Sequence, residues 1–177
     1  ACGNTVKYYF SATATNGTIE TDPETAPADT YSTFSGNGLN AVFSDNFETD
    51  TGWTVSSTAT AGAWARGIPV AGGNAPSTDA DGSGKCYVTG LAANVDVDGG
   101  TTTLTSPTFS GSAGNVYLQY SRWYKITGTV ATDSFSVEAS NNNGSTWTTV
   151  ETVAYNSSEA SGGWYSKQFQ LSSILPL

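Results

Sequence analysis

The stretch VYLQYSRW, residues 116–123, decides the fold class of this chain, because apolar and polar side chains largely alternate along it. The stretch DSFSVE, residues 133–138, repeats the alternation. Successive side chains of a β-strand point to opposite faces, so a period of two indicates strands with one buried and one solvated face. Both stretches therefore predict strands of a sheet.

Further short runs on either side are rich in β-branched and aromatic residues, which fit a pleated, half-buried surface. Turn residues separate most of them, and no convincing helical pattern occurs. About eight such strands are typical of an all-β protein with a two-sheet antiparallel β-sandwich. We expect a jelly roll that is incomplete at both ends. The expected strands cover residues 42–47, 53–57, 85–89, 101–104, 115–123, 134–139, 147–153 and 164–171.

The chain falls into three zones. Residues 1–20 read as a terminal hairpin whose turn is Asn16-Gly17, a pair that supplies the positive φ angles of a tight turn. Residues 21–40 contain two prolines and no periodicity, which predicts a linker. Residues 41–177 form the predicted jelly-roll module.

Composition restricts the classes of partner. The 177 residues carry 6 Lys+Arg against 15 Asp+Glu, for a formal net charge of −9. Such a surface repels phosphate backbones and anionic lipids, which disfavours nucleic-acid and membrane-surface binding. It is compatible with divalent cations, and no apolar run approaches the roughly 20 residues that span a bilayer.

Histidine is absent from the chain. Without it there is no Ser-His-Asp or Cys-His arrangement and no common zinc-hydrolase site, so we assign no catalytic residue. The two cysteines, Cys2 and Cys86, are too few for a disulfide scaffold. They either pair with each other, pair with partners in other sequence, or stay reduced.

A calcium-loop pattern begins at Asn94. Oxygen-bearing side chains occupy the alternate positions Asn94, Asp96 and Asp98, and Gly99 closes the run. Hard Ca²⁺ takes six to eight oxygen ligands, and alternate residues wrap one ion where a glycine permits the turn. The final bidentate Glu of an EF-hand is missing, since Thr105 stands there, so a standard EF-hand is excluded.

A second Asp-x-Asp-Gly core occurs at Asp79 and Asp81. Asp-Gly is also a common turn pair, so both clusters are alternatively ordinary solvated turns. Two clusters in a chain with 15 acids favour metal, and we predict structural Ca²⁺ at one or both. Other acids are candidates to complete a site from elsewhere in the fold: Asp45, Glu48 and Asp133.

Residues 140–147, SNNNGSTW, fit the Asp-box pattern, with Asn142 at the Asp position. In sialidases this motif recurs in every propeller blade, but here it occurs once. We interpret it as a structural hairpin turn in which Asn142 binds turn amides and Trp147 holds the following strand.

The five tryptophans raise the possibility of sugar stacking, since pyranose C–H faces pack on exposed rings. A sandwich of this size also needs large core side chains, and most of the tryptophans are expected in the core. The residues expected at a ligand surface are Trp64, Arg66 and Tyr124, which lie in a Gly/Pro-rich loop or at a strand end.

Residues 42–171 resemble the jelly-roll modules of secreted bacterial proteins related to MAM domains and to the cleaved adhesin domains of gingipain-type proteases. The resemblance implies a non-catalytic appendage of a secreted hydrolase or adhesin, often with structural calcium. Residues 1–20 resemble the last hairpin of an immunoglobulin- or fibronectin-like domain. The motifs that carry the module resemblance, in order, are DNFE (45–48), TGW (51–53), AWARGIP (63–69), TLTSP (103–107), RWY (122–124), DSFSV (133–137) and NGSTW (143–147).

The leading hypothesis is a calcium-stabilised adhesion or accessory module of a secreted or cell-surface protein. It would bind a glycan or an extracellular protein and contact other domains of its own polypeptide. The rival is a supporting segment of a secreted hydrolase, most plausibly a peptidase, whose catalytic domain lies elsewhere. A carboxylate-based glycan-cleaving enzyme would need two acids facing one groove about 5–10 Å apart.

Overall fold

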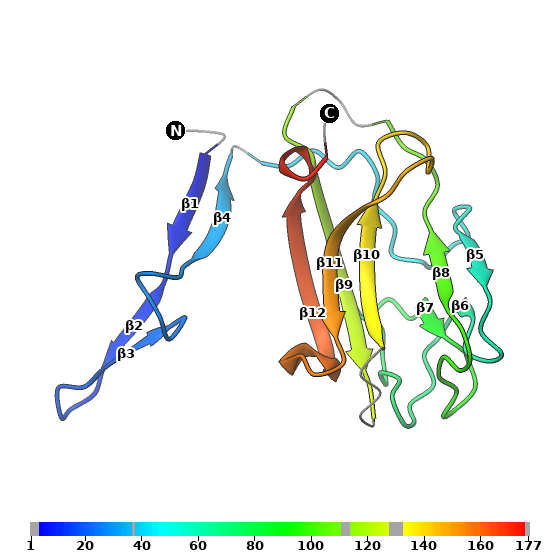
Figure 1. Ribbon diagram of the computed structural model, residues 1–177, viewed down its shortest axis with the longest axis horizontal. Coiled ribbons are helices and arrows are strands. Elements are labelled where there is room, and N and C mark those ends of the chain that lie inside the picture. The colour runs from blue at the N-terminus through cyan, green and yellow to red at the C-terminus, as the bar shows by residue number, and fades with distance from the viewer. Residues whose placement is uncertain (1–3, 37, 111–113, 128–132, 176–177) are drawn as a thin grey trace. The chain divides into compact units, whose positions relative to one another are not determined.

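A computed structural model describes residues 4–36, 38–110, 114–127 and 133–175 (Figure 1). The chain divides into two compact units, Ala1–Ala41 and Val42–Leu177. Every strand pairing in the described ranges is antiparallel. Those ranges contain no helix that is both long and apolar enough to cross a membrane.

The first unit consists of two strand pairs. Strand β1 (Asn4–Tyr8) pairs with β4 (Tyr31–Ser35), and β2 (Phe10–Thr13) pairs with β3 (Ile19–Asp22). The predicted linker over 21–40 is therefore wrong for β4, whose Tyr31 and Thr33 have β propensity despite the prolines that precede them.

The turn of the β2–β3 hairpin lies at Asn16-Gly17. Gly17 has φ 86°, and the Asn16 side chain accepts a hydrogen bond from the Thr18 amide (3.0 Å). The Ala14 amide donates to the Thr18 carbonyl across the turn (2.8 Å). An Asn side chain that binds the backbone two residues on, followed by a glycine with positive φ, is the chemistry that a tight hairpin requires.

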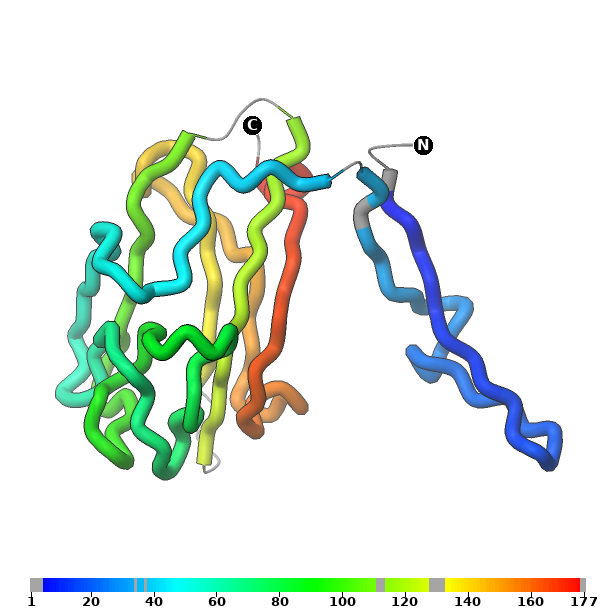
Figure 2. The backbone as a smooth tube through the Cα atoms, turned by 180° about the vertical axis from the view of Figure 1, so that it is seen from behind, coloured from blue at the N-terminus to red at the C-terminus, as the bar shows by residue number. Residues whose placement is uncertain are grey.

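The second unit is all-β and sandwich-like, which confirms the predicted fold class. Figures 1 and 2 show β9 to β12 together on one side of the unit and β5 to β8 on the other. The described helices of the unit are two short 3₁₀ turns, η1 (Ser158–Ala160) and η2 (Leu171–Ser173). The pairs are β5 (Thr54–Ser57) with β8 (Thr102–Thr105), β6 (Trp64–Gly67) with β7 (Cys86–Thr89), β9 (Tyr117–Lys125) with β12 (Ser161–Gln170), and β10 (Ser134–Ala139) with β11 (Thr148–Ala154).

One expected strand is absent and one real strand was missed. Residues 42–47 form no strand, because Asp45 accepts a hydrogen bond from the Phe47 amide (2.7 Å) and Phe47 takes φ 65°, which closes a turn. The sequence predicts a loop at β6 because this strand ends in Gly67 and Pro69 follows two residues later. The other seven expected strands are present, with ends shifted by a few residues.

The alternation along β9 orients its side chains. Gln119 and Ser121 are exposed, and they form hydrogen bonds with their β12 partners, Gln168 and Ser166. Arg122 lies on the opposite face and is only 3% exposed. The alternation along β9 therefore places the Arg122 guanidinium between the β9–β12 pair and the β10–β11 pair.

A buried ion network surrounds this guanidinium. Arg122 donates to Glu151 through Nε (2.8 Å) and Nη2 (2.6 Å), and Nη2 also contacts Glu159. Lys167 Nζ donates to Glu159 (2.7 Å), and the Tyr120 hydroxyl donates to Glu151 (2.5 Å). Burial of a charge is tolerated only where partners neutralise it, and here two cations meet two carboxylates.

The apolar core of the described residues is small. The buried apolar side chains are Cys86 and Val88 on β7, Val153 on β11, and Ala160 and Leu175. Because few side chains supply hydrophobic burial, polar contacts carry an unusual share of the stability of this unit.

The hydrogen bonds of Asn142 in the β10–β11 turn agree with the Asp-box prediction. The Asn142 side chain accepts from the Thr146 amide (2.9 Å) and donates to the Thr146 hydroxyl (2.8 Å). Ser140 Oγ accepts from the Gly144 amide (2.9 Å) and donates to Asn142 Oδ1 (2.9 Å). Trp147 packs over Gly144, where a Cβ would lie 3.3 Å from the ring.

Replacing Asn142 with alanine is expected to lower the free energy of unfolding by about 1–2 kcal/mol, because several hydrogen bonds of the turn are lost at an exposed site. Urea unfolding of Asn142→Ala and of the control Ser145→Ala, an exposed residue of the same turn, measures the difference. Equal stability of the two variants would contradict this structural role.

Candidate metal centre

Three carboxylates converge on one hydroxyl in the loop between β6 and β7. Ser83 Oγ lies 3.2 Å from Glu48 Oε1, 3.0 Å from Asp79 Oδ2 and 2.7 Å from Asp81 Oδ1. We call these three acids the acidic cluster. Asp79 and Asp81 come from the second predicted motif, and Glu48 comes from a loop more than 30 residues away in the sequence.

Backbone amides bind all three carboxylates, and the Ser83 amide donates to Asp81 Oδ1 (3.0 Å). The Gly84 amide donates to Asp79 Oδ2 (2.8 Å), and the Lys85 amide donates to Glu48 Oε1 (2.5 Å). Arg66 of β6 binds the loop that carries Glu48, since its Nη1 donates to the carbonyls of Phe47 (3.1 Å) and Glu48 (3.3 Å). The cluster is thus assembled by the main chain and by a neighbouring strand.

The carboxylates of the acidic cluster form no ion pair among the described residues, although Lys85 and Arg66 donate to the backbone carbonyl of Glu48. A hydroxyl carries one proton, so Ser83 satisfies one of the three carboxylate oxygens at a time. Across the described part of the chain, no Lys or Arg forms an ion pair with Glu48, Asp79 or Asp81. Asp79 is nevertheless only 6% exposed, and a buried carboxylate normally has a cation, metal or dense hydrogen bonding beside it.

One carboxylate of the cluster and one neighbouring thiol have shifted pKa values. Hydrogen bonds from the Ser83 hydroxyl and amide lower the pKa of Asp81 below its ordinary value. Burial raises the pKa of the nearby Cys86 thiol to about 11, and the charges of Asp79 and Asp81 add to the rise. Cys86 is a free thiol, while Cys2 lies outside the described residues.

The side chains of the acidic cluster are not arranged around a metal-sized space. Within the described ranges, no three Asp, Glu, His or Cys side chains are arranged as a preformed ligand set. The carboxylates surround the Ser83 hydroxyl instead. A cation at this place would displace that hydroxyl or take it as one more oxygen ligand.

Asp45 is a structural residue and stands apart from the cluster. It accepts hydrogen bonds from the Phe47 amide (2.7 Å), the Trp53 indole (2.9 Å) and the Thr51 hydroxyl. Burial acts against these bonds, but together they lower the pKa of Asp45. Its oxygens are occupied by donors of its own loop, so it supplies no ligand to the cluster.

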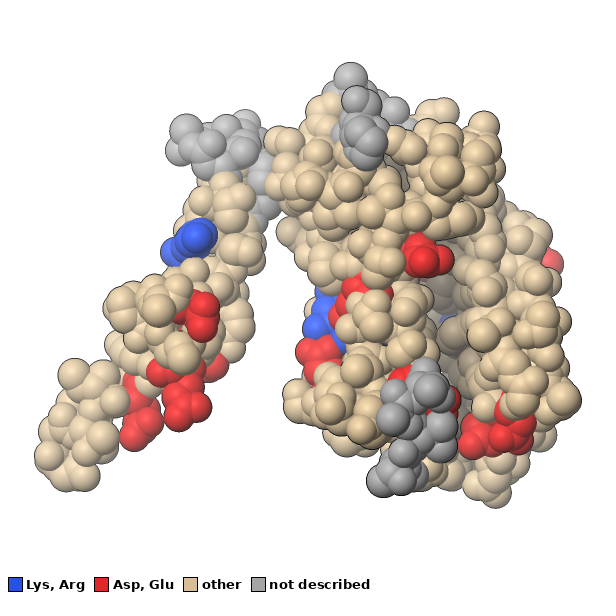
Figure 3. Space-filling view, in the orientation of Figure 1, with Lys and Arg blue, Asp and Glu red and all other residues tan. Residues whose placement is uncertain are grey.

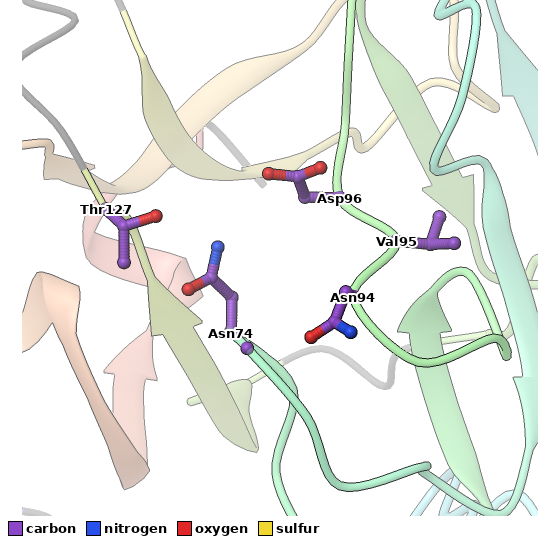
Figure 4. Close-up of a pocket in the computed structure, with 6 residues that line it drawn as sticks. Asn74, Asn94, Val95, Asp96 and Thr127 are labelled. Atoms are coloured by element: carbon purple, nitrogen blue, oxygen red, sulfur yellow. The ribbon is translucent and has the colours of Figure 1, made fainter.

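Asn94, Asp96 and Asp98 do not share the contacts of the acidic cluster. The Asp98 carbonyl accepts from the Thr60 amide (2.8 Å) and hydroxyl (3.0 Å) in a bridge to the loop before β6. Asn94 and Asp96 line a separate hollow with Asn74, which Figure 4 shows. The two predicted motifs therefore lie in different surroundings.

Trp64 and Arg66 are not an exposed ligand platform. Both are half-buried in β6. The Trp64 amide (3.1 Å) and indole (3.3 Å) donate to Thr102 of β8. With Arg66 engaged by the Glu48 loop, both predicted ligand residues already hold strands and loops together.

Tyr124 is also half-buried, with its ring 6.0 Å from that of Phe135. Burial raises the pKa of Tyr124, and the charge of Asp133, which is an exposed acid, adds to the rise. Asp133 makes no contact with the acidic cluster that the structure records. Trp147, expected in the core, is 47% exposed at the β10–β11 turn.

Sequence reasoning missed three polar residues. Ser83 stands at the centre of the acidic cluster, and Asn74 and Thr127 line the hollow. Ser83 follows the Asp-x-Asp-Gly core directly, which is a usable signal. Asn74 and Thr127 carry no local signal, because tertiary folding alone brings them to Asp96.

Acidic side chains outnumber basic ones on the face in Figure 3, in agreement with the net charge of −9.

Comparison of the chain with protein-family models, with curated proteins and with solved structures finds no match. The site must therefore be interpreted from its own chemistry.

Proposed function

We propose that the second unit is a non-catalytic accessory or adhesion module of a secreted bacterial protein, and that Ca²⁺ at Glu48, Asp79 and Asp81 stabilises it. The observation that carries the proposal is the convergence of three carboxylates on one hydroxyl without an ion pair. A divalent cation would neutralise carboxylate charge that no described side chain offsets by an ion pair.

The donor chemistry favours calcium over other metals. The cluster offers oxygen atoms only, the chain has no histidine, and the nearby Cys86 thiol is held protonated at neutral pH. Zinc prefers nitrogen and sulfur ligands. Magnesium demands near-ideal octahedral geometry, whereas calcium accepts six to eight oxygens in irregular arrangements.

An accessory role agrees with the state of the buried acids. Burial acts to raise the pKa values of Glu151 and Glu159, but hydrogen bonds from Arg122, Tyr120 and Lys167 outweigh it and lower both. A general acid at neutral pH needs a raised pKa. These two carboxylates therefore suit a structural network better than glycoside cleavage.

An extracellular setting suits a weak calcium site. Extracellular modules bind calcium with a Kd of about 10⁻⁴–10⁻³ M. A cluster that still needs water or backbone ligands belongs in this range. The acidic surface and the Ser, Thr and Asn content support secretion, with a glycan or an extracellular protein as partner.

Calcium is expected to raise the Tm of the protein by about 3–10 °C, because a cation that binds the folded form at 10–100 times its Kd adds about 1.4–2.7 kcal/mol. Differential scanning calorimetry in EDTA and in about 10 mM CaCl₂ measures the shift. The control is MgCl₂ at the same concentration, which should give a smaller shift. An equal Tm in EDTA and in calcium would contradict the proposal.

A further inference from the structure

A hollow of about 270 Å³ opens between residues 72–75, residues 94–96 and the end of β9 (Figure 4). We propose that this hollow binds one residue of a neutral glycan. The inference rests on the proposed function as an extracellular binding module and names a ligand class and a site for it. The lining residues are Gly73, Asn74, Asn94, Val95, Asp96 and Thr127.

Asn74 is one of the polar residues that line this hollow. Asn74 Oδ1 is shielded from bulk solvent and has no hydrogen-bond donor. The backbone at this turn is nevertheless fixed, because the Trp123 indole donates to the Asn74 carbonyl (2.8 Å) and Lys125 Nζ donates to the Gly73 carbonyl (2.8 Å). In Figure 4 the Asn74 amide nitrogen, and not the shielded oxygen, points toward Thr127 and Asp96, so the nitrogen is placed to donate to a ligand hydroxyl.

The other polar groups face the same space. Figure 4 shows the Thr127 hydroxyl, the Asn74 amide and the Asp96 carboxylate turned toward the gap between them. Gly62 fixes the backbone at Asp96, since a Cβ there would lie 2.1 Å from the Asp96 carbonyl oxygen. Amide, hydroxyl and carboxylate groups together offer both donors and acceptors, as vicinal sugar hydroxyls require.

Size and charge decide between a sugar and a cation. The hollow corresponds to roughly nine water volumes, and a pyranose with its hydroxyls displaces roughly six. A bare Ca²⁺ would leave most of this space unfilled and would meet one carboxylate, that of Asp96. The net charge of −9 and Asp96 itself repel acidic sugars.

The test is a titration of ¹⁵N-labelled protein, saturated with calcium, with glucose, galactose, mannose and N-acetylglucosamine, and with glucuronate as the charged counterpart. At least one neutral sugar is expected to shift the amide signals of Gly73, Asn94 and Asp96 with a Kd of about 1 mM. Glucuronate should bind at least tenfold more weakly.

Variants locate the site. Asn74→Ala and Asp96→Asn should each weaken sugar binding at least tenfold, while Asp98→Asn, two residues along the same segment, should bind as the wild type does. Asn74→Ala should keep its Tm, because the oxygen that it removes has no partner. Should that variant fail to fold, Asp96→Asn against Asp98→Asn gives the same comparison.

Several results would overturn the glycan site. They are the absence of shifts with every neutral sugar, unchanged binding in Asp96→Asn, or shifts of these amides by CaCl₂ alone without any response to sugar. The calcium dependence of Tm on the same samples reports the acidic cluster separately. A calcium-dependent Tm without sugar binding rejects the hollow and leaves the proposed calcium site standing.

Discussion

Replacing Arg122 with alanine is expected to lower the free energy of unfolding by about 3–5 kcal/mol, the range found when one partner of a buried ion pair is removed. Arg122 is 3% exposed, and its guanidinium bridges Glu151 of β11 and Glu159 of η1. Without it, two carboxylates between β9–β12 and β10–β11 lose their principal counterion. Chemical denaturation of the wild type and of Arg122→Ala at pH 7 measures the loss.

Lys167→Ala is the matched control, because Lys167 meets the same two carboxylates from a more solvated position. Its removal should cost no more than about 1 kcal/mol, as for exposed pairs. A loss below about 1 kcal/mol in Arg122→Ala as well would mean that the network contributes little to stability.

The same network predicts loss of stability in acid. The pKa values of Glu151 and Glu159 lie below their ordinary 4.5 in the folded protein. A group whose folded pKa is depressed stabilises the fold above its unfolded pKa, and this contribution disappears as the pH falls through the folded pKa. The free energy of unfolding should therefore decline below about pH 4.5. In Arg122→Ala the decline should be shallower, and an equal slope in both proteins would argue against this origin.

Replacing Asp79 with asparagine is expected to abolish most of the calcium-dependent rise in Tm. The carboxylate is buried in the acidic cluster and is the least replaceable of its oxygen donors. In EDTA, where no calcium is bound, the substitution should not lower the stability of the protein. The variant should then be at least as stable as the wild type, because the substitution removes a buried charge that lacks an ion pair and retains an oxygen for the Gly84 amide.

Asp133→Asn provides the control for this experiment, since Asp133 is an exposed acid outside the cluster. It removes the same charge and should leave the calcium response intact. Calorimetry of the three proteins, each with EDTA and with calcium, gives the comparison. A calcium response preserved in Asp79→Asn would place the ion elsewhere.

Local patterns predicted the fold class because strand period and turn chemistry are local properties. The alternation at 116–123 became β9, and the Asn16-Gly17 and Asn142 turns formed with the expected hydrogen bonds. Strand β4 was missed, since its pairing with β1 is a tertiary contact that overrides a proline-rich context. Residues 42–47 failed as a strand because Asp45 binds the backbone of its own turn.

The candidate sites were predicted less completely, because they depend on contacts between distant segments. Asp79, Asp81 and Glu48 were named as metal ligands, but their meeting at Ser83 requires the fold. The Asn94–Asp98 motif looked like a calcium loop, yet the Asp98 backbone joins a bridge with Ala61. Arg122 at an inward position of β9 was not anticipated, since a charged residue is ordinarily placed outside.

The most direct test of the central claim is a crystal structure grown in calcium, with an anomalous difference map. The account predicts a peak bound by oxygens of Glu48, Asp79 and Asp81 at about 2.3–2.6 Å, with the Ser83 hydroxyl displaced or serving as a further ligand. A map without an anomalous peak at this place, in which the carboxylates contact only the Ser83 hydroxyl and water, would contradict it.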